Sequence, residues 1–200
     1  MSSTARLLFP PIRWSADDAS YDAFRPEIEK GLALGVGGWI IFGGPAAAVR
    51  ELTAELRERS PHPILVGADL ERGAGQQFAG ATPLPPPGVL AELDDLDVTR
   101  RAGELTAREA LAMGINWVYA PVADLDLEPA NPIVGSRAFG KDPERAARHV
   151  TAWIEGCRQG GALSCAKHFP GHGRTTSDSH LGLPTVDVDE AALETDLLPF

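Results

Sequence analysis

Short, uniformly apolar runs alternate along this chain with longer segments in which apolar residues recur every three or four positions. The short runs predict strands of a sheet that is covered on both faces, because a half-exposed strand would show polar residues at alternate positions. The longer segments predict amphipathic helices. We predict strands at residues 6–9, 39–42, 64–68, 115–122 and 162–166, and helices at residues 21–34, 46–59, 98–113, 142–159 and 188–198.

Individual residues predict the start of one of these helices and the buried face of another. Asp142 and Pro143 begin one helix, with a carboxylate as N-cap acceptor and proline at the first helical position. In the helix at residues 98–113, we expect Leu105 and Leu111 to face the core.

The predicted elements repeat the order strand–helix about five times, with one longer glycine- and proline-rich loop at residues 73–87. This alternation indicates a parallel sheet, either doubly wound or closed into a (β/α)8 barrel. The glycines at residues 35–38 precede their strand, whereas a dinucleotide-binding fold needs them after it. Polar residues follow the third, fourth and fifth strands, where a barrel builds its sites. We therefore predict an α/β fold of the TIM-barrel type, of which this chain supplies about the first five βα units.

Charge and composition exclude several classes of protein. The net charge of −10 argues against a nucleic-acid partner, because phosphate binding needs clustered lysine and arginine. No apolar run approaches the roughly 18 residues of a membrane span, and none near the start reaches the about 7–15 residues of a signal-peptide core. Cys157 and Cys165 are too few for a disulfide framework. We expect a soluble, cytoplasmic protein with no nucleic-acid or membrane partner.

The stretch from Lys167 to His180 concentrates side chains that transfer protons. It holds three of the five histidines in a loop that follows a predicted strand. Asp178 and His180 are two residues apart, so their side chains can meet. A carboxylate beside one imidazole nitrogen fixes the tautomer and favours the protonated form. Such a pair can donate and accept a proton near neutral pH.

Polar side chains from three predicted strand ends add to this stretch. We expect Asp69, Arg137, Lys167 and His168 to converge on one pocket. Together they offer hydrogen-bond acceptors, a forked donor and a point charge. This combination suits a polyhydroxylated ligand such as a sugar.

Each of these residues also has a structural interpretation. Asp69 could cap the following turn, and Arg137 could form a structural ion pair with Asp124 or Asp126. His168 could be a core histidine with satisfied hydrogen bonds. It is their expected convergence, more than any single residue, that favours catalysis.

A metal site is a further alternative. His168, His172, Asp178 and His180 have a ligand-like composition. The spacing between the first two histidines crosses a proline and a glycine instead of lying on a helix, and no cysteine joins them. Proton transfer is therefore the favoured interpretation.

Three motifs resemble those of one enzyme family. Residues 167–173 (KHFPGHG) with residues 178–180 (DSH) closely resemble the signature of bacterial β-N-acetylglucosaminidases of glycoside hydrolase family 3. Residues 67–71 (GADLE) resemble the third-strand motif of that family, and residues 136–140 (SRAFG) its fourth-loop motif. The order and spacing of these motifs agree from about residue 30 to the end.

The resemblance implies a TIM-type barrel and a retaining, two-step mechanism. His180 would be the general acid/base, tuned by Asp178, in place of the carboxylic acid that most glycosidases use. Histidine suits this role because an anionic acid/base would repel an anionic attacking group.

The resemblance also implies the substrate. Asp69, Arg137, Lys167 and His168 would hydrogen-bond the hydroxyls of a terminal N-acetylglucosamine. Gln77 stands where the family has a further sugar-contacting arginine; it can form a hydrogen bond but carries no charge. The implied substrate is a small N-acetylglucosaminide, in the cell a muropeptide fragment of the cell wall, and neither a cofactor nor a metal is implied.

In the family, the nucleophile is an aspartate near the end of a seventh strand. Asp187, Asp189 and Asp196 lie in a predicted loop and helix and do not match it. We therefore expect residues 1–200 to be a C-terminally incomplete catalytic barrel domain with little or no glycosidase activity alone. An open sheet edge would also favour self-association.

Other functions stay open at this stage. A β-N-acetylglucosaminide phosphorylase would suit the same Asp178–His180 pair, because its attacking phosphate is an anion. A non-catalytic sugar-binding module would keep the pocket without a nucleophile. A metal-dependent hydrolase is the remaining alternative, which chelators would test.

Overall fold

The computed structural model describes residues 3–200 and contains a five-stranded parallel sheet. Each strand pairs in parallel with the next strand along the chain, in the order β1-β2-β3-β4-β5. This sequential order is that of a barrel, whereas a doubly wound sheet reverses its order at a switch point. The strands are β1 (Pro11–Arg13), β2 (Gly38–Phe42), β3 (Leu65–Ala68), β4 (Trp117–Val118) and β5 (Leu163–Ser164).

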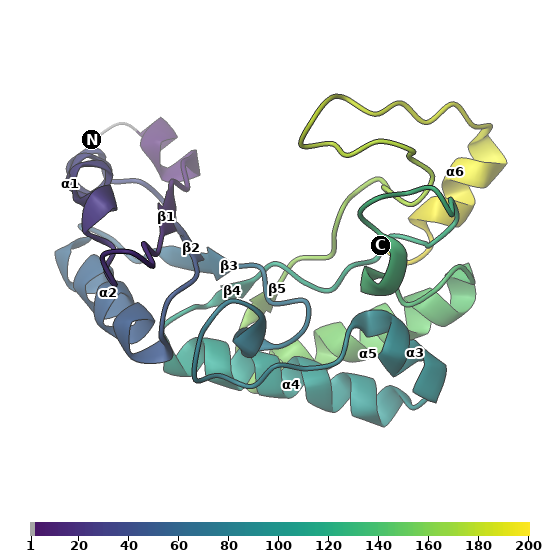
Figure 1. Ribbon diagram of the computed structural model, residues 1–200, viewed down its shortest axis with the longest axis horizontal. Coiled ribbons are helices and arrows are strands. Elements are labelled where there is room, and N and C mark those ends of the chain that lie inside the picture. Colours follow the sequence, from purple (N-terminus) through teal and green to yellow (C-terminus); the bar gives the residue numbers. More distant parts are fainter. Residues whose placement is uncertain (1–2) are drawn as a thin grey trace.

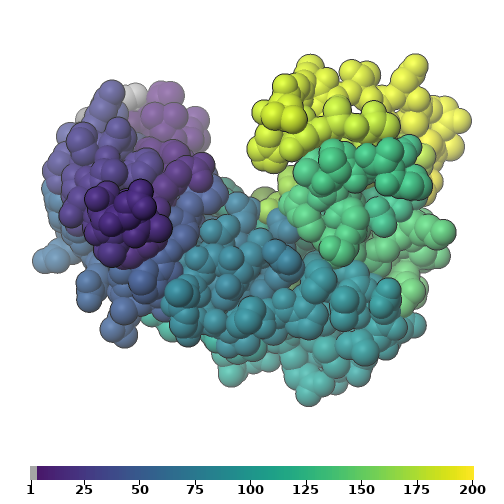
Figure 2. Space-filling model, in the orientation of Figure 1, coloured from purple at the N-terminus to yellow at the C-terminus, as the bar shows by residue number. Residues whose placement is uncertain are grey.

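Helices α1, α2, α4 and α5 lie along the outer side of the curved sheet (Figure 1). The C-terminal segment with α6 lies at the opposite end of the molecule from α1. The space-filling view shows a hollow between the N-terminal part of the chain and this C-terminal segment (Figure 2). The helices are α1 (Arg25–Leu34), α2 (Ala46–Arg59), α3 (Pro87–Leu93), α4 (Leu96–Ala112), α5 (Pro143–Gly160) and α6 (Glu190–Leu197). Short 3-10 turns occur at Ser3–Leu7, Asp22–Phe24, Ala74–Gln76 and Gly135–Arg137.

The bounds of one predicted helix and the predicted cap of another are confirmed. Helix α2 has the predicted bounds. The Asp142 carboxylate accepts a hydrogen bond of 2.7 Å from the backbone N–H of Arg145 at the start of α5. Asp189 caps α6 in the same way, through the N–H of Ala192 at 2.9 Å. These ends depend on local side chain–backbone bonds, which the sequence specifies directly.

The prediction of a first strand at residues 6–9 was wrong. A 3-10 helix occupies Ser3–Leu7, and β1 lies at Pro11–Arg13 instead. Pro11 lacks an N–H, but it is the first residue of its strand, where proline is tolerated. Ile12 is the residue of this strand that is fully buried. The predicted loop at residues 73–87 likewise ends earlier, because Pro87 starts helix α3.

The orientation predicted for α4 was also wrong. Leu105 and Leu111 are each 38% exposed. The buried face of α4 is made of small residues instead, because α4 and α5 approach each other closely. An added Cβ at Gly103 would lie 2.2 Å from the carbonyl oxygen of Trp153. The buried positions of α4 are Thr99, Ala102, Gly103, Thr106, Ala107 and Ala110.

The core lies between the sheet and the helices. Its fully buried side chains include Trp39, Ile41, Val66, Ile115 and Val118. Burying one such side chain contributes about 1.5–3 kcal/mol to the stability of the fold.

Within residues 3–200, no helix is long and apolar enough to cross a membrane.

Candidate active site

The carboxyl ends of the strands bring the polar motifs together at one edge of the sheet. Asp69 and Glu71 follow β3, Asp124 follows β4, and Lys167 and His168 follow β5. Because the strands are parallel, these loops all leave the sheet at the same edge, where barrels build their sites.

Two carboxylates and two cations form the floor of the site. Lys167 Nζ lies 2.6 Å from both Asp69 Oδ1 and Glu71 Oε1. Arg137 binds Glu71 through two hydrogen bonds of 2.8 Å, from Nε to Oε2 and from Nη2 to Oε1. Such bidentate, charge-assisted pairs are strong and fix side-chain geometry. We call Asp69, Glu71, Arg137 and Lys167 the pocket floor. Among residues 3–200, the Asp69 side chain caps no turn and Arg137 forms its ion pair with Glu71 instead of Asp124 or Asp126, so the two structural alternatives considered for these residues do not apply.

Glu71 remains ionised in this floor. Its side chain is 4% exposed, and burial by itself would raise its pKa. Hydrogen bonds from Arg137 and the charge of Lys167 outweigh burial and lower the pKa of Glu71 to about 2. The hydrogen bond to Glu71 in turn raises the pKa of Arg137. Glu71 is therefore an acceptor and a scaffold, and it is not suited to donate a proton near neutral pH.

His168 is oriented by Asp124. Its Nδ1 lies 2.6 Å from Asp124 Oδ2, while Asp124 Oδ1 accepts hydrogen bonds from the backbone N–H groups of His168 and His172, at 3.1 and 2.7 Å. Burial would raise the pKa of Asp124, but the hydrogen bond from His168 and the further N–H donors lower it. A proton on Nδ1 leaves Nε2 as the acceptor facing Arg137 Nη2, 3.4 Å away.

The structure brings Asp178 and His180 into contact, as expected. Asp178 Oδ1 accepts a bond of 2.8 Å from the backbone N–H of His180 and lies 2.6 Å from Nδ1 of the same residue. The backbone bond, followed by the imidazole bond, lowers the pKa of Asp178. The His180 side chain is 81% exposed, so its Nε2 is free to meet a ligand.

Most of the predicted site residues line one hollow of about 290 Å³. This volume lies near the lower end of small-molecule pockets and suits a single sugar ring. Asp178 does not line it but stands behind His180. The lining residues are Asp69, Glu71, Arg72, Gln76, Gln77, Arg137, Lys167, His168 and His180.

The sequence analysis did not predict four of the residues that form this site. Glu71 lies inside a motif that the sequence displays, but nothing local shows that it pairs with two cations. Asp124 follows a predicted strand, which was the available signal, but its histidine partner is distant in sequence. Arg72 follows the predicted third strand and Gln76 lies in the predicted loop at residues 73–87, and nothing in the sequence distinguishes either as a pocket residue.

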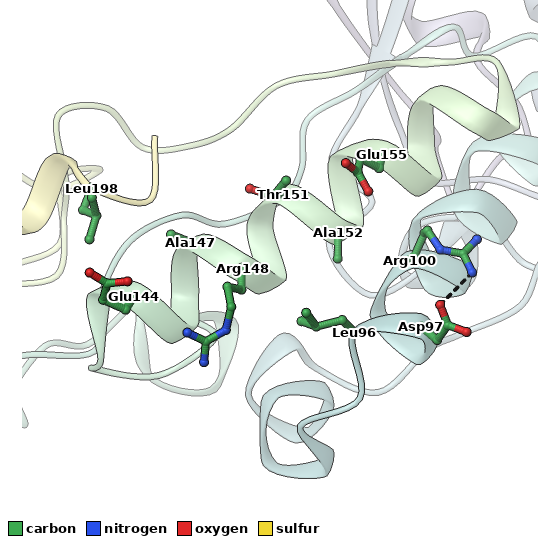
Figure 3. Close-up of a pocket in the computed structure, with 10 residues that line it drawn as sticks. All are labelled: Leu96, Asp97, Arg100, Glu144, Ala147, Arg148, Thr151, Ala152, Glu155 and Leu198. Atoms are coloured by element: carbon green, nitrogen blue, oxygen red, sulfur yellow. Dashed lines mark hydrogen bonds and ion pairs between the residues drawn. The ribbon is translucent and has the colours of Figure 1, made fainter.

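A larger hollow of about 450 Å³ lies on the outer surface of α4 and α5, bordered by Leu198 after α6 (Figure 3). Its lining contains no histidine and no residue from a strand end. The one ion pair drawn there joins Arg100 Nη2 and Asp97 Oδ1 at 2.8 Å on the exposed face of α4. None of the motifs at the strand ends contributes to this hollow, and the smaller pocket is therefore the candidate site.

The described part of the chain offers no evident metal centre. Among residues 3–200, no group of three or more histidine, cysteine, aspartate or glutamate side chains is arranged to hold a metal ion. His168 is bonded to Asp124, and Nδ1 of His172 lies 2.5 Å from the Thr175 hydroxyl. The residues of the metal alternative thus face different partners.

Comparison with known proteins places the chain in a family. The family described as "Glycosyl hydrolase family 3 N terminal domain" matches residues 23–200. The β-hexosaminidase of Neisseria meningitidis serogroup C (strain 053442) is 38% identical over 197 residues, which are 92% of this chain and 54% of that protein. The chain thus spans about half the length of the curated relatives it matches.

Two solved structures extend the comparison. NagZ from Neisseria gonorrhoeae in complex with N-trifluoroacetyl-D-glucosamine is 32% identical with a TM-score of 0.83, covering 96% of this chain and 58% of that one. The β-glucoside phosphorylase BglX bound to 2FGlc is 32% identical with a TM-score of 0.80, covering 90% of this chain and 32% of that one. The sequential parallel strands, the strand-end pocket and these likenesses agree, and the chain belongs to glycoside hydrolase family 3, with a fold of the TIM-barrel type.

Proposed function

We propose that this chain carries the sugar-binding and acid/base part of a retaining β-N-acetylhexosaminidase, which removes terminal β-linked N-acetylglucosamine. The observation that carries the proposal is the meeting of the pocket floor with His180 in one hollow. Relatives named β-hexosaminidase, and a neighbouring structure in complex with an N-acylated glucosamine, support it.

The floor residues would bind the sugar. The carboxylate oxygens of Asp69 and Glu71, both in contact with Lys167 Nζ, would accept hydrogen bonds from sugar hydroxyls, while Arg137 of the floor and the neighbouring His168 would supply further hydrogen bonds. Since these groups already point at one another before a ligand enters, sugar binding would exchange existing bonds for new ones with little reordering. Gln77 would contribute an uncharged hydrogen bond.

His180 would be the general acid/base. Its Nδ1–H is held by Asp178, so Nε2 can protonate the leaving-group oxygen and afterwards accept a proton from the attacking water. The nucleophile of this mechanism would be an aspartate after a later strand than β1–β5. We also propose that residues 1–200 are part of one catalytic barrel domain and have little or no turnover without that residue.

Phosphorolysis is the second candidate function. The likeness to a β-glucoside phosphorylase over 90% of this chain favours it, and a histidine acid/base tolerates an anionic attacking group. Both functions use the same pocket and differ in the species that attacks the glycosyl intermediate.

The cellular setting is part of the proposal. The free thiols of Cys157 and Cys165 are compatible with the reducing cytoplasm, and the resemblance of the motifs suggests a muropeptide fragment as the natural substrate. Leu163 on the edge strand β5 is 55% exposed, which supports self-association through that edge. Light scattering over a range of protein concentrations tests this last point.

Calorimetric titration of the 200-residue chain with N-acetylglucosamine tests the proposal, with glucose as the matched ligand and Lys167→Met as the variant. We expect preferential binding of N-acetylglucosamine that the variant loses. Turnover of phenyl β-N-acetylglucosaminide, with phosphate varied, separates hydrolysis from phosphorolysis. Failure of the chain to bind N-acetylglucosamine would overturn the proposal, and binding without turnover in any polypeptide that contains residues 1–200 would favour the non-catalytic sugar-binding module.

A further inference from the structure

One cation of the pocket, Arg72, has no side-chain partner among the residues that the structure describes. Lys167 and Arg137 are neutralised by Asp69 and Glu71, which are the two carboxylates of the lining. Arg72 lines the same hollow, and within residues 3–200 its guanidinium forms no hydrogen bond or ion pair. In a chain of net charge −10, an uncompensated cation at a binding pocket is not expected from composition alone.

The backbone of Arg72 is fixed although its side chain is exposed. Its N–H donates a bond of 2.8 Å to Gln76 Oε1, and its carbonyl accepts one of 2.8 Å from the N–H of Leu84. The side chain therefore starts from a defined point on the pocket wall, and ligand binding has to order the Arg72 side chain but not its backbone.

Gln76 adds a second donor to this wall. Because its Oε1 accepts from the backbone of Arg72, its amide NH2 is the free end of the side chain. Gln77, the next lining residue, contributes no charge. The wall thus presents a guanidinium fork and an amide N–H group, and no atom of the described residues 3–200 accepts a hydrogen bond from either. A neutral sugar hydroxyl does not need this charge, whereas a carboxylate or phosphate matches a guanidinium fork in both charge and geometry.

We propose that Arg72, assisted by the amide of Gln76, binds an oxyanion beside the sugar in this pocket, an inference that rests on the proposed sugar-binding function. The oxyanion has two sources with the same chemistry. It is either inorganic phosphate bound next to the sugar or a carboxylate attached to the leaving group. Arg72 is then a residue that determines specificity, because it selects anionic over neutral ligands of equal shape.

Calorimetry on the 200-residue chain at constant ionic strength tests this with phenyl and 4-carboxyphenyl β-N-acetylglucosaminide, and with inorganic phosphate added to the phenyl compound. Hydrogen bonds to charged groups correspond to about a tenfold change in affinity. We expect a gain of that size from the attached carboxylate or from phosphate, lost in Arg72→Met and reduced in Arg72→Lys. Arg50→Met on the exposed face of α2 is the matched control and should leave the gain unchanged.

The different ligands in this titration distinguish the possible outcomes. A gain from the carboxyphenyl ligand identifies an attached anion, and a gain from added phosphate identifies a free one. Equal binding of neutral and anionic ligands, or the same gain in Arg72→Met as in the unchanged chain, overturns the role of Arg72 while the sugar-binding proposal stands. Failure of even the phenyl compound to bind overturns the proposed function itself. Thermal melting of each variant verifies that the fold is intact.

Discussion

The pocket floor and the acid/base loop, residues 173–188, meet at one hollow but are held in opposite ways. The floor joins loops after β3, β4 and β5 through short ion pairs, and the Glu71 side chain is 4% exposed. In the loop, Asp178 and His180 bond mainly to each other, and Leu181 and Leu183 are 89% and 96% exposed. The sugar-binding half is thus preorganised by tertiary structure, whereas the proton-transfer half takes its position from the loop as a whole.

The loop is anchored at its base. Arg174 Nε lies 2.7 Å from Asp196 Oδ2 on α6, and the ring of Phe169 packs edge-on against Phe200 with centroids 5.7 Å apart. Helix α6 therefore determines where the acid/base loop leaves the floor. This arrangement suggests that the two halves can be disabled separately, and the following predictions test that.

His180→Ala should have the largest effect, and on chemistry alone. We expect turnover of phenyl β-N-acetylglucosaminide to fall about 10²- to 10⁴-fold, because a positioned acid/base contributes about that much. Affinity for N-acetylglucosamine and the melting temperature should stay unchanged, since the side chain is exposed. Steady-state kinetics in a competent polypeptide containing residues 1–200 measures this, with Ser177→Ala as the loop control. An equal loss of sugar affinity would contradict the separation of floor and loop.

Glu71→Gln should break the floor. Removing one partner of a buried ion-pair network leaves Arg137 and Lys167 without their shared anion, and such changes cost about 3–5 kcal/mol. We expect the free energy of unfolding to fall by about 3 kcal/mol, near the lower end because both cations keep some exposure. Urea denaturation measures it. Asp97→Asn, which removes the exposed partner of Arg100, is the control and should have a much smaller effect. Similar losses in both variants would show that the floor is no more than a surface ion pair.

The pocket floor should also make the free energy of unfolding depend on pH in the acidic range. The pKa of Glu71 is lowered from 4.5 to about 2 in the folded chain, so the unfolded state binds the proton more readily. The stabilisation is then fully present above about pH 4.5 and is lost as pH falls towards 2. The difference in unfolding free energy between the chain without substitutions and the Glu71→Gln variant should decrease as the pH falls through this range. A difference that stays constant from pH 6 to pH 3 would be inconsistent with this.

Asp196→Asn should have a smaller effect on stability than Glu71→Gln and a local effect on the loop. The Arg174–Asp196 pair is partly buried, so we expect a loss of about 1 kcal/mol, between the values of surface and buried pairs. Limited proteolysis within residues 174–188 should become faster as the anchor is lost. Asp187→Asn, in the exposed part of the same loop, is the matched control. Unchanged cleavage rates in Asp196→Asn would mean that α6 does not position the loop.

Features that depend on near neighbours were predictable from the sequence. The bounds of α2, the Asp142 cap of α5 and the contact between Asp178 and His180 all rest on residues within a few positions of one another. The alternation of apolar runs and amphipathic segments likewise specified a parallel α/β fold, because backbone hydrogen bonding and burial limit the structures that such a pattern can form.

Tertiary structure alone decided the rest. The pairing of Glu71 with Arg137 and of Asp124 with His168 joins loops far apart in sequence, so no local pattern reveals it. The small buried face of α4, which leaves Leu105 exposed, follows from how closely α5 approaches. The sequence by itself determined most of the elements, with β1 and α3 as exceptions, and most of the chemically active residues of this protein. The tertiary structure decided which of those residues neutralise one another, because charges interact through space and not along the chain. It also decided that the Arg72 guanidinium has no partner among residues 3–200.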